Sequence, residues 1–242
     1  MQWYWLPEYL PRFAEGLWVT VQLLTISLVA GFALAIPIGL VMATNSPRPL
    51  AWLARGFCTV IRGTPLLIQI WLLYYGLGNL FPYFPELRQS FLWPILREAF
   101  PYAAVAFTLS VAGYEGHILR GAFLSVPKGE LEAARAFGMG RFTVLWRVWL
   151  PRALQNVFPT LAGEAILTLK SVPLAATITV FDVYGVGTIV RQETYRVYEP
   201  LLFVGFIYLL LAGLIIVLFR WAENRVPNAA GTGGPATKGV PA

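Results

Sequence analysis

Long apolar stretches without a charged residue alternate along the chain with short segments that hold most of its lysine and arginine residues. Four charge-free runs cover residues 16–47, 63–85, 99–114 and 200–219. A fifth run, 153–181, is interrupted only by Glu164 and Lys170. A helix of roughly 20 apolar residues crosses a bilayer. The pattern therefore predicts about five transmembrane helices.

Two of these helices have ends that the pattern leaves open. The third begins near Trp93 or near Phe100. The fourth is either bent by Pro159 or ended near Pro173, because proline interrupts the hydrogen bonding of a helix.

The composition supports the same fold class. Of the 242 residues, 57% are hydrophobic and 12% are charged, and the mean hydropathy is +0.64. Such a chain cannot bury its apolar surface in one aqueous globule, so we expect an all-α, polytopic membrane protein. Residues 1–226 form one transmembrane domain. Residues 227–242, rich in Gly, Pro, Ala and Thr, are expected to be a disordered cytoplasmic tail.

The distribution of positive charge predicts the orientation, because cytoplasmic flanks retain Lys and Arg during insertion. One set of flanks holds Arg48, Arg55, Arg120, Lys128, Arg135, Arg141, Arg147, Arg152, Arg220, Arg225 and Lys238. The opposite side holds only Arg12, Arg88, Arg97, Arg191 and Arg196. We therefore expect the N-terminus outside and the C-terminus in the cytoplasm. Topology accounts for most of the net charge of +6, so no nucleic-acid partner is needed to explain it.

The basic segment 121–151 is too long and too patterned to be a simple connector. Pro127 can occupy the start of a helix, which places Glu130 and Glu132 near its positive end. Gly138 and Gly140 end that helix, because glycine adopts the left-handed conformation most easily. A second amphipathic helix, 141–150, is expected to run back to the membrane and stop at Pro151.

This segment resembles the EAA loop of ABC-importer membrane subunits. The family pattern reads E-A-A, three residues, G, nine residues, I, one residue, L-P. Here it is met by Glu132, Ala133, Ala134, Gly138, Leu150 and Pro151, with Val148 in place of Ile. The segments 62–69, 73–76, 120–122 and 125–129 further resemble the polar amino-acid permeases of this family, which include histidine, glutamine, arginine and opine permeases.

The resemblance implies an ABC type I importer-like transmembrane domain in the bacterial inner membrane, working by alternating access. Its EAA helix would dock into a dimer of separate ABC ATPase subunits. A second permease subunit, either the same chain or a paralogue, and an extracytoplasmic solute-binding protein would complete the transporter. The chain has no G-x-x-x-x-G-K-[ST] phosphate loop, so ATP hydrolysis is expected on the other chain. We expect no enzymatic activity, cofactor or metal site here.

The substrate is expected to be a polar amino acid, with cationic amino acids or opines favoured. An ionisable residue within the bilayer is costly and marks a functional site. Glu164 resembles the glutamate at this place in permeases for basic amino acids and opines, and its carboxylate can pair with a guanidinium or ammonium group. Pairing with Lys170 or with a polar group of a neighbouring helix is the structural alternative. Gln69, Tyr114 and Glu115 are further pathway candidates.

Two other functional classes compete with this interpretation. A secondary, ion-coupled transporter shares the composition, but would usually be longer, with repeats around discontinuous helices, and has no use for a docking loop. An intramembrane hydrolase needs a nucleophile and a base, whereas His117, the one histidine, lies near the cytoplasmic end of a helix without a recognisable serine motif. Dependence of uptake on ATP separates these classes.

Overall fold

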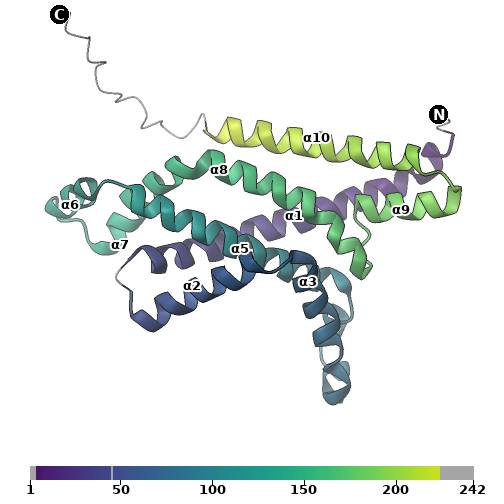
Figure 1. The fold of residues 1–242 in the computed structure, drawn as a ribbon, viewed down its shortest axis with the longest axis horizontal. Coiled ribbons are helices and arrows are strands. Elements are labelled where there is room, and N and C mark those ends of the chain that lie inside the picture. Colours follow the sequence, from purple (N-terminus) through teal and green to yellow (C-terminus); the bar gives the residue numbers. More distant parts are fainter. Residues whose placement is uncertain (1–3, 45, 224–242) are drawn as a thin grey trace, which may run out of the picture.

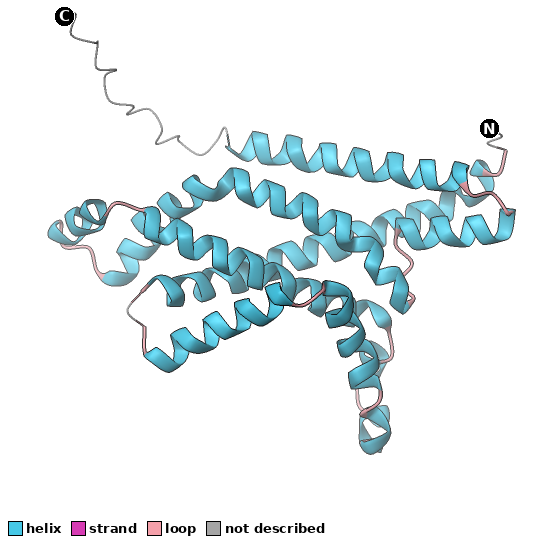
Figure 2. Cartoon of the chain, viewed as in Figure 1, coloured by secondary structure: helices cyan, strands magenta, loops and turns pink. Residues whose placement is uncertain are grey.

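The computed structural model describes residues 4–44 and 46–223, and the regular structure within these ranges is entirely helical (Figure 1, Figure 2). The expected tail, 227–242, lies outside the described residues. The α-helices are α1 (Leu6–Ala43), α2 (Arg48–Gly63), α3 (Leu66–Trp71), α4 (Trp93–Leu96), α5 (Ala99–Ser125), α6 (Lys128–Ala136), α7 (Arg141–Val144), α8 (Leu150–Ser171), α9 (Val183–Thr194) and α10 (Tyr198–Glu223). Figure 1 shows α6 at one end of the bundle and α9 at the other.

Three helical segments of the described chain are long and apolar enough to cross a membrane. They are α1, the continuous stretch Arg141–Ile178 and α10. A fourth crossing arises if α2 and the following helical residues, which are bent by 105°, form one broken span. Helix α5 has 27 residues but carries Glu115, His117 and Arg120. The helical membrane fold is thus as expected, and the figure of five spans is approximate.

The second predicted helix, 63–85, is wrong as a single span. Helix α2 begins at Arg48 and ends at Gly63, and Thr64 is extended, with φ −115° and ψ 142°. Because the residue before a proline avoids the helical region, Pro65 forces this break. After it come α3 and a π-helical turn, Leu72–Gly76. This arm leads away from the bundle in Figure 1.

The expected helix end at Pro151 is also wrong. A π-helical turn, Leu145–Trp149, joins α7 to α8, and the Leu150 N–H donates to the Leu145 carbonyl, five residues back. Pro151 has no N–H to donate, and the π-helical turn before it lets the chain continue into α8 past this position. Helix α8 contains Pro159 and gives way after Ser171 to a 3₁₀ helix, Val172–Ile178, so the end near Pro173 is confirmed.

Glycines allow α1 and α5 to pack closely along their length. A Cβ atom at Gly31 would lie 2.5 Å from Val111, and one at Gly39 would lie 2.8 Å from Leu119. Ala35, between them, is fully buried. Small residues at such spacing let helix backbones approach in membranes. The α1–α5 pair is therefore the centre on which the other helices are placed.

Candidate coupling loop and substrate cavity

Helix α6 ends as its glycine predicts. Gly138 has φ +80°, its N–H donates to the Arg135 carbonyl at 2.9 Å, and the Met139 N–H donates to the Ala134 carbonyl at 3.2 Å. These two bonds form the Schellman arrangement that satisfies the last carbonyls of a helix. Gly140 plays a different part, because it is extended and precedes α7. The loop therefore holds α6 as a short, sharply ended helix.

The residues of the EAA pattern divide between surface and core. Glu132, Ala133, Gly138 and Pro151 are exposed, whereas Ala134 and Leu150 are buried. Leu150 packs in a cluster with buried residues of α5. The loop thus has an anchored inner side and a free outer side.

A bidentate ion pair fixes α6 against α8. The Arg152 Nη2 and Nε atoms donate to the two carboxylate oxygens of Glu130 at 2.8 and 2.9 Å. This hydrogen bonding holds the pKa of the Glu130 carboxyl below its usual value. Both side chains are a third exposed, so the pair contributes modestly to stability. Its paired bonds nevertheless define the orientation of α6 on the bundle.

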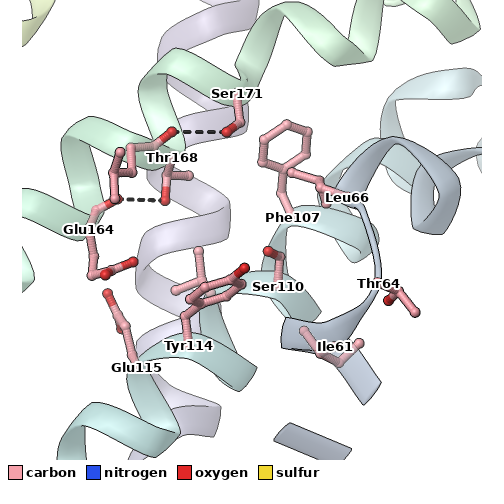
Figure 3. A pocket seen from close by; sticks show the side chains of 12 residues that line it. Ile61, Thr64, Leu66, Phe107, Ser110, Tyr114, Glu115, Glu164, Thr168 and Ser171 are labelled. Atoms are coloured by element: carbon pink, nitrogen blue, oxygen red, sulfur yellow. Dashed lines mark hydrogen bonds between the residues drawn. The ribbon is translucent and has the colours of Figure 1, made fainter. Parts of the chain in front are cut away.

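A cavity of about 180 Å³ lies among α2, α5 and α8 (Figure 3). Its lining is Ile61, Thr64, Leu66, Phe107, Ser110, Val111, Tyr114, Glu115, Glu164, Leu167, Thr168 and Ser171. The structure therefore brings together three of the four pathway candidates, Tyr114, Glu115 and Glu164. The fourth, Gln69, is not part of the lining.

The two glutamates point toward one another in Figure 3. Glu115 is 4% exposed, and its Oε2 atom has no hydrogen-bond partner. Within residues 4–44 and 46–223 neither carboxyl forms a salt bridge, and Lys170 is exposed six positions beyond Glu164. A buried carboxyl oxygen without a partner is costly, so the cavity is suited to a ligand that donates hydrogen bonds and carries positive charge.

The hydroxyl groups on α8 reinforce this preference. Thr168 Oγ1 donates to the Glu164 carbonyl and Ser171 Oγ to the Leu167 carbonyl, each at 2.9 Å. Because their protons are used within the helix, the remaining capacity of both oxygens is to accept. The α8 side of the cavity is thus rich in acceptors.

Gln69 fixes the bend beside the cavity instead of lining it. Its Nε2 donates to the Ile61 carbonyl at 2.8 Å, to the Thr64 carbonyl at 3.1 Å and to Thr64 Oγ1 at 2.9 Å. These acceptors lie where α2 ends and its carbonyls lack helical partners. Gln69 therefore positions Thr64, a lining residue that the sequence did not single out. Thr168 and Ser171 were also missed, since hydroxyl residues are common in membrane helices and carry no distinctive signal.

In the described part of the chain, no group of three or more His, Cys, Asp or Glu side chains is placed so that it could hold a metal ion. His117 lies instead in a second cavity with arginine residues.

Comparison with known proteins assigns the loop and the fold to one family. Residues 35–227 match the family described as the binding-protein-dependent transport system inner membrane component. The chain belongs to this family. It is an ABC permease, as the EAA pattern indicated.

The permease resembles several characterised relatives over most of its length. The octopine transport system permease protein of Rhizobium radiobacter is 39% identical over 220 residues, which cover 87% of this chain and 86% of the relative. The nopaline transport system permease protein of Agrobacterium fabrum is 35% identical, covering 96% of this chain and 95% of the relative. The arginine ABC transporter permease protein of Escherichia coli K12 is 34% identical, covering 90% and 96%.

Solved structures show the same fold. An amino acid ABC transporter crystallised with histidines matches with a TM-score of 0.77 and 28% identity, covering 93% of this chain and 99% of that chain. An inward-facing methionine ABC transporter matches with a TM-score of 0.66 at 19% identity, covering 93% and 97%, a likeness of fold alone.

Proposed function

We propose that this chain is the membrane-spanning subunit of an ATP-driven importer that carries cationic amino acids or opines by alternating access across the inner membrane. The acceptor-rich cavity with Glu115 and Glu164 is the observation that supports this substrate class best. A guanidinium group carries five N–H donors and a permanent charge, which suits such a cavity. The opine and arginine permeases among the relatives support the same class.

Coupling to ATP hydrolysis is assigned to the loop 121–151. Helix α6 would dock into a separate ATPase through the exposed residues Glu132 and Ala133, and ATPase closure would move it as a rigid body. The Glu130–Arg152 pair and the buried Leu150 would pass that movement to α8, which carries Glu164. The chain itself would bind no cofactor, with ATP held by its partner.

The remaining partners follow from the family. A second permease subunit would complete the pathway, and an extracytoplasmic solute-binding protein would deliver the substrate. Both agree with membership of a family defined by binding-protein-dependent transport.

The decisive experiment measures uptake of labelled arginine and glutamine by the assembled transporter in proteoliposomes, with binding protein and ATPase supplied. Glu164→Gln removes the charge with little change of shape, so arginine uptake should fall by about tenfold or more while ATPase assembly persists. Lys170→Gln, on the same helix but outside the cavity, is the control and should keep most of the activity.

Other results would reject parts of the proposal. Preference for glutamine, or indifference to Glu164→Gln, would make that glutamate structural and leave a broader polar amino-acid permease. Uptake driven by an ion gradient without ATP would favour a secondary transporter.

A further inference from the structure

A second cavity, of about 390 Å³, opens between α2, α5 and the end of α1. Its basic lining residues are Arg55, Arg62, His117 and Arg120, and no Asp or Glu contributes. Within the described ranges none of these four forms a salt bridge, and Arg120 Nε makes only a long hydrogen bond, 3.4 Å, to the Met42 carbonyl. Unpaired guanidinium groups around a cavity favour an anionic ligand.

This basic cavity adjoins the acidic one. The guanidinium carbon of Arg62 lies 5.8 Å from the centroid of the Tyr114 ring, and Tyr114 lines the acidic cavity. Ile61 and Thr64, on either side of Arg62 in the chain, line that cavity too. Arg62 is also close enough to both Glu164 and His117 to contribute to their electrostatic environment. Arg62 therefore stands at the junction of two cavities of opposite charge.

The position of Arg62 is not explained by membrane topology alone. It lies 14 residues beyond Arg48, where α2 begins, which is about 21 Å along a helix. Positive charge that orients a membrane protein is needed only near the cytoplasmic flank. An arginine this far along the helix is expected to face a polar pathway and to have a function there.

We propose that the basic cavity binds the carboxylate of the substrate, with Arg62 as the specificity-determining residue. The substrate is then a molecule with a guanidinium or ammonium group at one end, held by Glu115 and Glu164, and a free carboxylate at the other. This rests on the proposed function and narrows it, because a cation without a carboxylate satisfies only half of the site. Arg55 lines the same cavity and adds to the positive charge that holds this carboxylate, and Arg120 extends the positive region beyond it.

The test needs only binding, measured on the assembled permease and ATPase in lipid nanodiscs without binding protein. Arginine, arginine methyl ester and agmatine compete against labelled arginine. All three carry the guanidinium, but only arginine has a free carboxylate. The wild-type complex should prefer arginine by about tenfold, as expected from one lost charge-assisted hydrogen bond. Equal binding of the three ligands would overturn the proposal.

Substitutions then test whether Arg62 causes the preference for arginine over agmatine. Arg62→Gln should bring the ratio of arginine to agmatine binding close to one, and Arg62→Lys, which keeps the charge, should restore part of it. Arg48→Gln, on the same helix but outside both cavities, should leave the ratio unchanged. If Arg62→Gln does not assemble, Arg55→Gln lowers the ratio in its place. A ratio insensitive to both substitutions would overturn the proposal.

Failure of this inference is distinguishable from failure of the proposed function. Glu164→Gln should weaken arginine and agmatine alike, since both present a guanidinium. If it weakens neither, the proposed cationic site is wrong. If Glu164→Gln weakens the binding of both ligands, but neither Arg62→Gln nor Arg55→Gln changes the arginine to agmatine ratio, only the carboxylate site is wrong.

Discussion

At the scale of single residues, Asp182 shows how a buried carboxyl organises the end of the bundle that carries α9. It is fully buried, its Oδ1 accepts from the Gly185 N–H at 2.8 Å, and its Oδ2 accepts from the Tyr208 hydroxyl at 2.7 Å. The next residue, Val183, donates its N–H to Thr20 at 3.1 Å. Helices α1, α9 and α10 are thus joined through one short polar segment.

Removing the hydroxyl of Tyr208 should therefore destabilise the protein. Tyr208→Phe leaves a buried carboxylate oxygen without its donor, which costs about 1 to 3 kcal/mol. The midpoint of thermal unfolding in detergent should fall. Tyr198→Phe is the matched control, because Tyr198 is 76% exposed, and its midpoint should stay at the wild-type value. An equal response of the two variants would show that the Asp182 contact contributes nothing.

The candidate site was predictable at this scale only where a residue was conspicuous. Glu115 and Glu164 stand out because a carboxyl within or beside an apolar run is rare. Thr168 and Ser171 do not stand out, since their role depends on where their protons point. Gln69 is polar and stood out, but its contact with the end of α2 depends on the bend at Thr64 and Pro65, which the pattern of charges does not show.

At the scale of elements, α6 depends on the backbone of Gly138. A Cβ atom there would meet nothing within 4 Å, so any cost of a side chain comes from φ +80° and not from crowding. An alanine in this left-handed conformation costs about 1 to 2 kcal/mol. Gly138→Ala should loosen the end of α6, lower ATP-driven uptake several-fold and leave membrane insertion intact. Uptake with parallel measurement of ATPase retention checks this.

Gly140→Ala provides the matched comparison for that variant. Gly140 also has open space around it, but its φ of −64° suits any residue. Its uptake should equal that of the wild type. If both variants behaved alike, the left-handed turn would have no part in coupling.

Element boundaries were the weakest part of the prediction, for identifiable reasons. A charge-free run shows where lipid is tolerated but not where hydrogen bonding breaks. The helix expected over 63–85 begins only after the bend at Thr64 and Pro65, and α2, which lies before that run, is needed to complete a span. Conversely, Pro151 was expected to end a helix, yet the π-helical turn before it lets the helix continue. A proline lies at both positions. The helix breaks before Pro65, where Thr64 is extended, and continues past Pro151, where a π-helical turn precedes the proline.

At the scale of the whole molecule, the excess of Lys and Arg in one set of flanking segments predicts which end of the bundle faces the cytoplasm. Exposed residues at the two ends of the bundle make this testable in intact cells. Tyr198 and Phe137 are 76% and 86% exposed, and Cys58, the one native cysteine, is buried. In a Cys58→Ala background, a membrane-impermeant maleimide should label Tyr198→Cys and spare Phe137→Cys until the cells are opened. The reverse labelling would place the coupling loop outside and would be incompatible with docking to a cytoplasmic ATPase.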